Sequence, residues 1–348
     1  MRTAKELSHA IVHRVLNRLY IDRGDYRHTV FVAGTGRSGT TWLEEIINFD
    51  HDHRILFEPF HSKQVPLVAH WNYRQYLRPD ETDARFVEPA RRILAGQLRH
   101  PWVDQFNTKH LVSRRLIKDI RANLLLYWIR QHFPEIPIVL LLRHPCAVAH
   151  SKIAMGWHTH IEDFLSQPAL IEDFLQPLVP LLESTHDDFD RHILLWCIEN
   201  WIPLLQFSHG EIHVCFYEDF CTQPEHEARA LLEYLHRPFD PVLLDVIERP
   251  SALSKNHSAI VAGGNVLDSW RRGIDDQRIE RALQLLRCFG LDRIYGEGSL
   301  PQIRSSEALE LFGPSTSMST ITKHDWNVAP VSLSRVELAH SSAQQSAS

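Results

Sequence analysis

Stretches rich in apolar residues recur along the chain and predict a set of buried strands. They cover residues 30–33, 54–57, 111–117, 138–142 and 211–216. Each stretch is four to seven residues long, which suits a strand better than a helix. Between them, apolar residues return at helical spacing and predict helices over residues 42–47, 124–132, 164–182, 193–205, 225–235 and 277–288. This alternation of short strands and helices predicts an α/β fold with a parallel sheet.

The two ends of the chain carry different patterns. Residues 6–20 have apolar positions at helical spacing, with Arg14 and Arg18 on the other side, and predict a helix packed on the domain. The alternative for this segment is a helix lying on a membrane surface. From about Leu300 the chain is rich in Ser and Thr without periodicity, which predicts a mostly disordered tail. We therefore expect an N-terminal helix, one large domain and a tail over residues 1–27, 28–298 and 299–348.

A glycine-rich turn joins the first predicted strand to the helix after it. Its sequence is Gly34-Thr35-Gly36-Arg37-Ser38-Gly39, followed by Thr40 and Thr41 in the first turn of the helix. The N–H groups of such a loop converge on one point with the positive helix end behind them, so the loop can hold a phosphate. The glycine spacing is that of a P-loop, but Thr40 replaces the Lys of NTPases, and the cation stands inside the loop as Arg37. The alternative is a glycine turn that binds no ligand.

This loop resembles the phosphosulfate loop of the sulfotransferases that use 3′-phosphoadenylyl sulfate (PAPS). The Arg-Ser-Gly-Thr-Thr core is close to that of the tyrosylprotein and carbohydrate branches. The resemblance implies a P-loop NTPase-like, three-layer α/β/α fold with a central parallel sheet. It also implies that the loop binds the 5′-phosphosulfate group through Ser38, Gly39, Thr40 and Thr41. Arg37 would bind there too and neutralise the charge that develops on the leaving oxygen.

A second motif supports the same resemblance. Arg143 follows the strand at 138–142, and Ser151 stands eight positions later, on the next helix. The pair is similar to the second sulfotransferase signature, which implies that both residues bind the 3′-phosphate of PAPS. A guanidinium and a hydroxyl held in this way make charge-assisted hydrogen bonds to a dianion. The alternative for Arg143 is a role in capping the helix.

Two later segments resemble other parts of the family's nucleotide site. Tyr217 follows the last predicted strand, and the resemblance implies that it contacts the nucleotide. Glu218 and Asp219 are expected to cap the next helix. Ser254 and Trp270 bound a segment where the family has a loop that folds over the nucleotide, so Ser254 is a candidate contact. An Arg-Lys-Gly closing motif is absent, so the phosphate contacts of this loop would fall to Lys255, Arg271 or Arg272.

Candidates for the chemical step follow the second and third predicted strands. Glu58 lies 21 positions after Arg37, at the carboxyl end of a strand, where side chains of a parallel sheet face the ligand crevice. This spacing resembles the tyrosylprotein branch and implies that Glu58 is the general base; a solvated loop carboxylate is the alternative. Lys118 resembles a Lys that reaches the transferred sulfuryl group, with an ion pair to a nearby carboxylate as the alternative. If Glu58 is not the base, His61 and then His110 are the next candidates.

The composition of the chain limits the kinds of molecule that it is expected to bind. The net charge of −6 argues against general nucleic-acid binding, and five scattered cysteines suggest no disulfide framework. The 23 histidines show no metal-binding spacing, so we expect no metal. Without a signal-peptide pattern or an apolar run of about 18 residues, we expect a cytoplasmic protein that meets membranes only at their surface. Four aromatic residues are candidates either for stacking on an acceptor or for ordinary packing: Trp71, Tyr73, Tyr76 and Trp102.

We therefore interpret the sequence as that of a PAPS-dependent sulfotransferase. It would transfer a sulfuryl group to the hydroxyl of a glycan, a glycolipid or another small metabolite and release adenosine 3′,5′-bisphosphate (PAP). Two alternatives stay open: a P-loop kinase-like phosphotransferase, and a non-catalytic protein that binds PAP. Thr40 in place of Lys argues against the kinase, as does the Arg143–Ser151 pair. Glu58 and Lys118 argue for catalysis.

Overall fold

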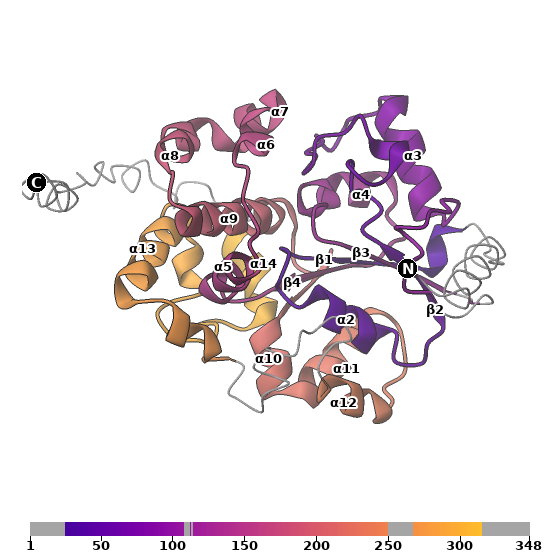
Figure 1. The fold of residues 1–348 in the computed structure, drawn as a ribbon. Coiled ribbons are helices and arrows are strands. Elements are labelled where there is room, and N and C mark those ends of the chain that lie inside the picture. The colour runs from indigo at the N-terminus through magenta and orange to yellow at the C-terminus, as the bar shows by residue number, and fades with distance from the viewer. Residues whose placement is uncertain (1–24, 108–111, 113, 250–266, 315–348) are drawn as a thin grey trace, which may run out of the picture.

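The computed structural model describes residues 25–107, 112, 114–249 and 267–314 (Figure 1). Some predictions lie outside the described residues, namely the helix over 6–20, His110, Ser254 and Lys255. Within the described ranges, no helix is both long and apolar enough to cross a membrane.

Five parallel strands form one central sheet, which confirms the predicted α/β fold. The strands are β1 (Thr29–Ala33), β2 (His53–Phe57), β3 (Arg114–Asp119), β4 (Ile138–Leu142) and β5 (His213–Phe216). Their order is β2-β3-β1-β4-β5, so β1 has β3 on one side and β4 on the other. The register of β1 and β3 runs from Thr29 opposite Arg115 to Ala33 opposite Asp119. All five carboxyl ends meet at one edge, where open α/β sheets bind their ligands.

Helices cover both faces of the sheet (Figure 1). One face is covered by α2 (Thr40–Ile47), α11 (Pro224–Tyr234) and α12 (Val242–Ile247). The other is covered by α4 (Leu126–His132), α5 (Pro145–Ala154) and α9 (Asp188–Gln206). Against α9 pack α13 (Asp276–Arg287) and α14 (Ala308–Phe312).

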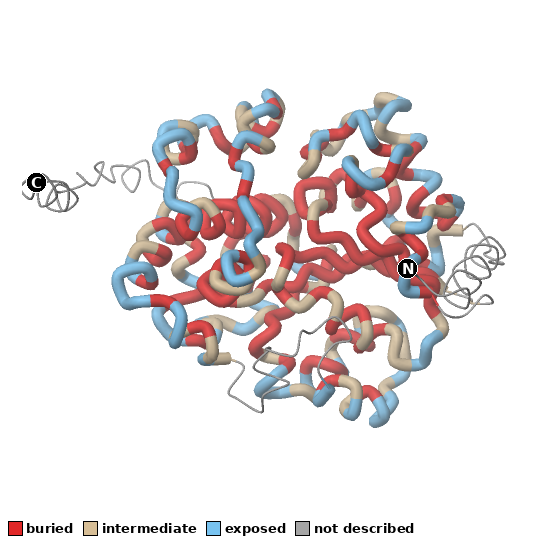
Figure 2. Tube along the Cα trace, viewed as in Figure 1, coloured by how far each residue is buried: buried red, intermediate tan, exposed pale blue. Residues whose placement is uncertain are grey.

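The core has one part on each side of the sheet, and β1 contributes to both. Val30 and Val32 point toward α2, whereas Phe31 and Ala33 point toward α9. A strand buried on both faces is apolar throughout, which explains why its sequence shows no alternation. Figure 2 shows the buried residues concentrated along the strands and on the inner faces of the helices.

Further elements connect these strands and helices. They are η1 (Tyr26–His28), η2 (Pro66–Val68), α3 (Ala84–Leu94), η3 (Asn123–Leu125), α10 (Tyr217–Thr222), η6 (Ser269–Gly273) and η7 (Leu291–Arg293).

The single helix predicted over residues 164–182 is wrong. The segment forms α6 (Glu162–Leu165), α7 (Pro168–Leu170), the π-helix η4 (Ile171–Leu175), η5 (Gln176–Leu178) and α8 (Val179–Ser184). Pro168, Pro177 and Pro180 stand in the first turns of α7, η5 and α8. Proline has no N–H and disrupts the preceding turn, so an apolar pattern of helical period here yields a series of short helices.

The tail that the sequence predicts to be mostly disordered from about Leu300 begins with ordered structure. Residues Ser305–Glu307 form η8, and α14 follows directly. Leu309 and Phe312 are buried on the α14 side that packs against α9. This helix has only five residues, which is too short a stretch to show a helical period, so the sequence pattern missed it. Residues 315–348 lie outside the described ranges.

The insertion between β2 and β3 is tied to the sheet through a buried arginine. Arg54 of β2 is fully buried and donates to Asp104 Oδ1 at 2.8 Å and to the carbonyl of Gly96 at 2.6 Å. On its other side the insertion is bound to the segment after α5, where the Tyr76 hydroxyl donates to Asp173 at 2.8 Å. These bonds tie the insertion to the start of β2 and to the segment after α5.

Candidate functional site

The glycine loop follows β1, between the ends of β3 and β4, and its shape depends on two of its glycines. A Cβ on Gly34 would lie 2.6 Å from the carbonyl oxygen of Leu141, so the loop passes β4 too closely for any side chain. Gly39 has a φ of +102° and a Cβ there would lie 2.7 Å from the Tyr217 ring. These positions let the chain turn tightly into α2, with the free N–H groups of its first turn at the loop.

Arg37, Arg143 and Ser151 meet beside this loop, although 106 positions separate the two arginines along the chain. Arg37 Nε donates to Ser151 Oγ at 3.0 Å, and Arg143 Nη1 donates to the carbonyl of Arg37 at 3.4 Å. The guanidinium of Arg143 lies 4.1 Å from the Tyr217 ring centroid. Burial, and then the charge of Arg143, lowers the pKa of Arg37. In the described part of the chain, neither arginine forms an ion pair with a carboxylate.

The loop also contains an unsatisfied hydroxyl. Ser38 is fully buried, and its Oγ has no hydrogen-bond partner. Thr40 is also buried, whereas Thr41 is half-buried. Thr35 behaves differently, because its hydroxyl accepts a 3.1 Å hydrogen bond from Asn200 of α9. A buried polar atom without a partner is rare in proteins, and the free Ser38 hydroxyl therefore fits a loop that binds an oxygen-rich ligand.

Glu58 sits directly after β2 in a buried ion pair with two cations. Its Oε1 accepts from Lys118 Nζ at 3.0 Å, and its Oε2 accepts from Arg121 Nη1. Burial alone would raise the pKa of Glu58, but Lys118 and Arg121 outweigh it and hold this pKa below its ordinary value. The carboxylate is therefore ionised, as a base must be, and it is not the solvated loop group that the sequence left open. The ion pair considered for Lys118 is present.

A second carboxylate holds the loops after β2 and β3 together. Asp119, at the end of β3, accepts from the N–H of Phe60 at 2.9 Å and from the N–H of Arg121 at 2.8 Å. The N–H of Glu58 donates to the carbonyl of Lys118 at 2.7 Å. Burial raises the pKa of Asp119 to about 6. Asp119 thus positions both Glu58 and its partner Arg121.

Arg37 and Glu58 share an unusual backbone conformation. Their φ angles are +77° and +45°, in the left-handed region that residues other than glycine rarely adopt. Such strain costs on the order of 1–3 kcal/mol and is often found at functional sites. His51 and His236 also have positive φ, so the observation supports the two candidates without singling them out.

His61, the alternative base, lies close to Glu58. It is 7 % exposed, and its Nδ1 has no hydrogen-bond partner. Its ring makes edge-to-face contacts with Tyr73 at 5.1 Å and with Trp102 at 5.4 Å. Burial, and then the charge of Arg121, lowers the pKa of His61 to about 4, so the ring is neutral at pH 7.

The predicted capping role of Glu218 and Asp219 is wrong, because neither side chain makes a capping hydrogen bond at α10 or α11. The carboxylate of Glu218 accepts from the N–H of His144 at 2.8 Å and from the hydroxyl of Tyr295 at 2.9 Å. Burial raises the pKa of Glu218 to about 7. Trp270 stacks on the His144 ring at 4.5 Å. Glu218 thus ties the turn that carries Arg143 to the C-terminal part of the domain.

Sequence analysis missed three polar residues around this site. Arg121 binds Glu58. The only feature of the sequence that could have indicated this role is its position three residues after Lys118. Asn200 binds Thr35 from a helix 165 positions away, and the sequence contains no signal for that contact. Lys152, next to Ser151 on α5, is buried, and this burial lowers its pKa to about 7.

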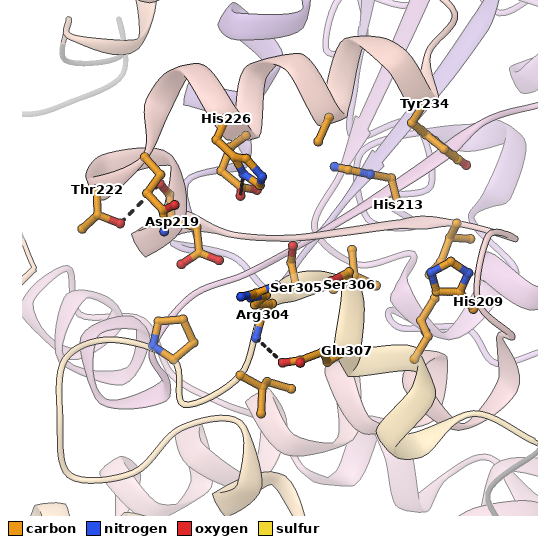
Figure 3. Close-up of a pocket in the computed structure, with 18 of the residues that line it drawn as sticks. His209, His213, Asp219, Thr222, His226, Tyr234, Arg304, Ser305, Ser306 and Glu307 are labelled. Atoms are coloured by element: carbon orange, nitrogen blue, oxygen red, sulfur yellow. Dashed lines mark hydrogen bonds and ion pairs between the residues drawn. The ribbon is translucent and has the colours of Figure 1, made fainter.

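A cavity of about 940 Å³ lies apart from this site, between β5, α10, α11 and the segment around η8 (Figure 3). Polar residues line it, including His209, His213, His226, Asp219 and Arg304. None of the predicted catalytic or nucleotide-binding residues lines it. In the described chain, no group of three His, Cys, Asp or Glu side chains is placed to hold a metal ion.

Comparisons with solved structures give low overlaps. The sulfotransferase domain from the curacin biosynthetic pathway has a TM-score of 0.38 and 17% identity, covering 74% of this chain and 96% of that chain. Mouse sulfotransferase SULT7A1 complexed with PAP has a TM-score of 0.35 and 13% identity, covering 80% and 92%. Retinol dehydratase, in complex with androsterone and inactive cofactor PAP, has a TM-score of 0.37 and 14% identity, covering 80% and 84%.

Sequence comparison is more decisive. No curated protein matches the chain. The model of a family described as "Sulfotransferase family" matches residues 29–241, which is more than half of the chain. The match begins with β1 and includes the glycine loop, Glu58, Lys118, Arg143 and Ser151. This match argues against the kinase-like alternative. We conclude that the chain belongs to the sulfotransferase family and that its reaction is sulfuryl transfer.

Proposed function

We propose that the sulfuryl donor of this enzyme is PAPS. The observation that carries the proposal is the pair Arg37 and Arg143, two neighbouring guanidinium groups without a carboxylate partner among the described residues. Glu218, whose carboxylate interacts electrostatically with Arg143, already accepts from His144 and Tyr295. Two such cations repel each other unless an anion lies between or beside them, and a ligand with phosphate groups at both ends of a ribose supplies that charge.

The residues around the loop fit such a ligand. Ser38 offers a buried hydroxyl without a partner, and Thr40 and Thr41 stand at the N-terminus of α2. We assign Arg37, Ser38, Gly39, Thr40 and Thr41 to the 5′-phosphosulfate, and Arg143, Ser151 and Tyr217 to the 3′-phosphate side. When bound, PAPS supplies a sulfuryl group activated as a mixed anhydride with phosphate. Arg37 would then lie where it can neutralise charge on the phosphate side of the broken bond.

On the acceptor side, we assign the proton transfer to Glu58. Its carboxylate is ionised and its partners Lys118 and Arg121 keep it oriented. A carboxylate with a lowered pKa is a weak base, so Glu58 gains basicity only if one cation moves away from it. Lys118 is suited to this, because a shift toward the transferred sulfuryl oxygens would both stabilise them and release Glu58. The acceptor is a hydroxyl compound, with a glycan, a glycolipid or another small metabolite as our candidates.

We also propose that the catalytic domain begins near residue 28 and extends past the predicted end at 298 to include α14, whose buried residues pack against α9. The first strand begins at Thr29. At the other end, Tyr295 is fully buried and binds Glu218, so the segment after α13 belongs to the nucleotide side of the domain.

The donor proposal predicts a selective thermal shift. PAP at about 100 times its Kd should stabilise the protein by about 2.7 kcal/mol and raise Tm by about 4 °C. ATP at the same concentration should shift Tm less, because it gives Arg143 and Ser151 no 3′-phosphate to bind. Differential scanning fluorimetry with both nucleotides tests this, and equal shifts would contradict the assignment of PAPS.

A glycine substitution tests whether the loop shape matters for the nucleotide. Gly39→Ala forces a φ of +102° on alanine, at a cost of about 1–2 kcal/mol, and brings a Cβ within 2.7 Å of the Tyr217 ring. We expect PAP affinity, measured by calorimetry, to fall about 3- to 10-fold as the loop shifts. The control is Gly210→Ala, where φ is +83° and no atom lies within 4 Å of the new Cβ. It should lose similar stability and keep PAP affinity; an equal loss of affinity in both variants would contradict the role of the loop.

A further inference from the structure

Three cationic side chains surround the ring of Tyr73 at the edge of the catalytic crevice. Lys63 Nζ lies 4.5 Å from the ring centroid, Arg121 lies 4.8 Å from it, and Arg74 lies 5.1 Å from it. Arg121 also binds Glu58, so this group, which we call the Tyr73 cluster, is continuous with the proposed base. An acceptor whose hydroxyl reaches Glu58 therefore has its neighbouring atoms close to these cations.

The carboxylates nearby leave part of this positive charge uncompensated. Arg74 binds Glu199 at 2.6 Å and Asp163 at 3.4 Å, so its charge is satisfied within the protein. Arg121 shares Glu58 with Lys118 and also has the carboxylate of Asp119 nearby, so, among the described residues, the charge left without a partner in this group is that of Lys63. Lys63 is exposed and, in the ranges that the structure describes, has no carboxylate partner.

Two buried polar atoms of the same region have no partner either. They are Arg121 Nε and the Nδ1 of His61, whose ring touches Tyr73 edge to face. Buried groups of this kind are nearly always hydrogen-bonded in a complete structure. The unpaired N–H of Arg121 and the free charge of Lys63 suit a ligand with anionic oxygen atoms, whereas the Nδ1 of the neutral His61 can either donate or accept.

Resting on the proposed function, we propose that the acceptor carries a carboxylate close to the hydroxyl that receives the sulfuryl group, and that Lys63 and Arg121 bind this carboxylate beside Tyr73. Guanidinium and ammonium groups form short, charge-assisted hydrogen bonds with carboxylates, and Tyr73 offers a flat surface for the carbon skeleton. Lys63 would then determine specificity without taking part in the chemical step.

Matched probes that differ by one charge test this proposal. The enzyme saturated with PAP is titrated by calorimetry with 4-hydroxybenzoate and with 4-hydroxybenzamide, which share the ring and the hydroxyl. We expect the acid to bind about 5- to 10-fold more tightly, the size of one partly exposed ionic contact. Lys63→Met should clearly reduce this preference, because only Arg121 then remains to bind the carboxylate. The control is Arg92→Met, which removes an exposed cation from α3, at a position in the insertion that is distant in sequence from Lys63. This variant should retain the preference for the acid.

Three results would overturn the proposal: equal binding of the two probes, a preference that is unchanged in Lys63→Met, or no measurable binding of either probe at millimolar concentration. Raising the salt from 50 to 500 mM should weaken the preference, because Lys63 is exposed to solvent. Lys63→Met should leave PAP affinity unchanged. If PAP itself does not bind, the donor proposal fails; the same titrations on the free enzyme still decide whether the cluster selects a carboxylate.

Discussion

Replacing Glu58 by Gln should lower turnover by about 10²–10⁴-fold, the usual contribution of a general base, while PAP affinity stays nearly constant. Gln keeps the size of the side chain and one carbonyl acceptor for Lys118 or Arg121, but it cannot take the proton of the acceptor. A loss confined to turnover would place Glu58 in the chemical step. Steady-state kinetics with an acceptor found by screening, together with calorimetry of PAP, measures both quantities.

The ion pair requires a control for folding. Gln leaves the two cations without their carboxylate, so some loss of stability is expected, and retained PAP binding shows that the donor site is intact. Glu88→Gln, on the exposed side of α3, is the matched control and should keep normal turnover. If Glu58→Gln retains more than about half of wild-type turnover, the base lies elsewhere, and His61 is the next residue to replace.

The direction of the pKa shift adds a pH test to the same variant. Lys118 and Arg121 hold the pKa of Glu58 below its ordinary value. Glu58 therefore stays ionised while the pH falls through the ordinary range of glutamate pKa values. Activity should therefore be lost only at pH values below the ordinary range of glutamate pKa values. This loss of activity at acid pH should be absent in the Glu58→Gln variant. The stability of the protein should depend on pH in the same direction. The ion pair contributes its full stabilisation above the pKa that Glu58 has in the unfolded chain, and this contribution is lost as the pH falls through the pKa of Glu58 in the folded protein.

Replacing Arg143 by Ala should weaken PAP binding by about 10- to 150-fold. One charge-assisted contact with a phosphate is worth about 1.5–3 kcal/mol, and each 1.4 kcal/mol is tenfold in affinity. Arg143 is held in place by a bond to the carbonyl of Arg37 and by the Tyr217 ring, so its guanidinium is already oriented before the ligand arrives. Calorimetry on the purified variant measures the effect directly.

A second ligand separates a phosphate contact from a structural role. Adenosine 5′-monophosphate lacks the 3′-phosphate, so Arg143→Ala should change its affinity only slightly. Equal losses for both ligands would mean that Arg143 acts by shaping the loop through the Arg37 carbonyl. Unchanged PAP affinity would remove Arg143 from the binding site and leave Ser151 and the loop to be tested alone.

Local features were predictable because their causes are local. The apolar run of β1, the glycines of the loop and the helix after them follow one another within 19 residues, from Thr29 to Ile47. A residue that permits a left-handed turn or a close approach is recognisable from its type alone, as Gly34 and Gly39 show. The spacing of Arg143 and Ser151 on consecutive elements is local in the same sense.

Predictions failed where the outcome depended on residues far apart in the chain. Glu218 reads as a helix cap, but its partner Tyr295 comes 77 positions later. Asn200 reaches Thr35 across 165 positions, and no pattern in either segment indicates the bond. Between residues 164 and 182, the spacing of apolar residues correctly indicated helical structure. The prolines in this segment divide it into several short helices, which the prediction of one continuous helix did not take into account.

The sequence by itself determined the strand–loop–helix unit, the order of the motifs and the residue types available for sulfuryl transfer, because these depend on neighbours along the chain. Only the tertiary structure decided that Glu58 is an ionised group held by Lys118 and Arg121, that Arg37 and Arg143 are adjacent cations without a carboxylate partner in the described chain, and that Lys63 has an uncompensated charge beside Tyr73. Parallel strands bring residues together through long crossovers, so the burial and the neighbouring charges that set protonation arise only when the sheet has formed.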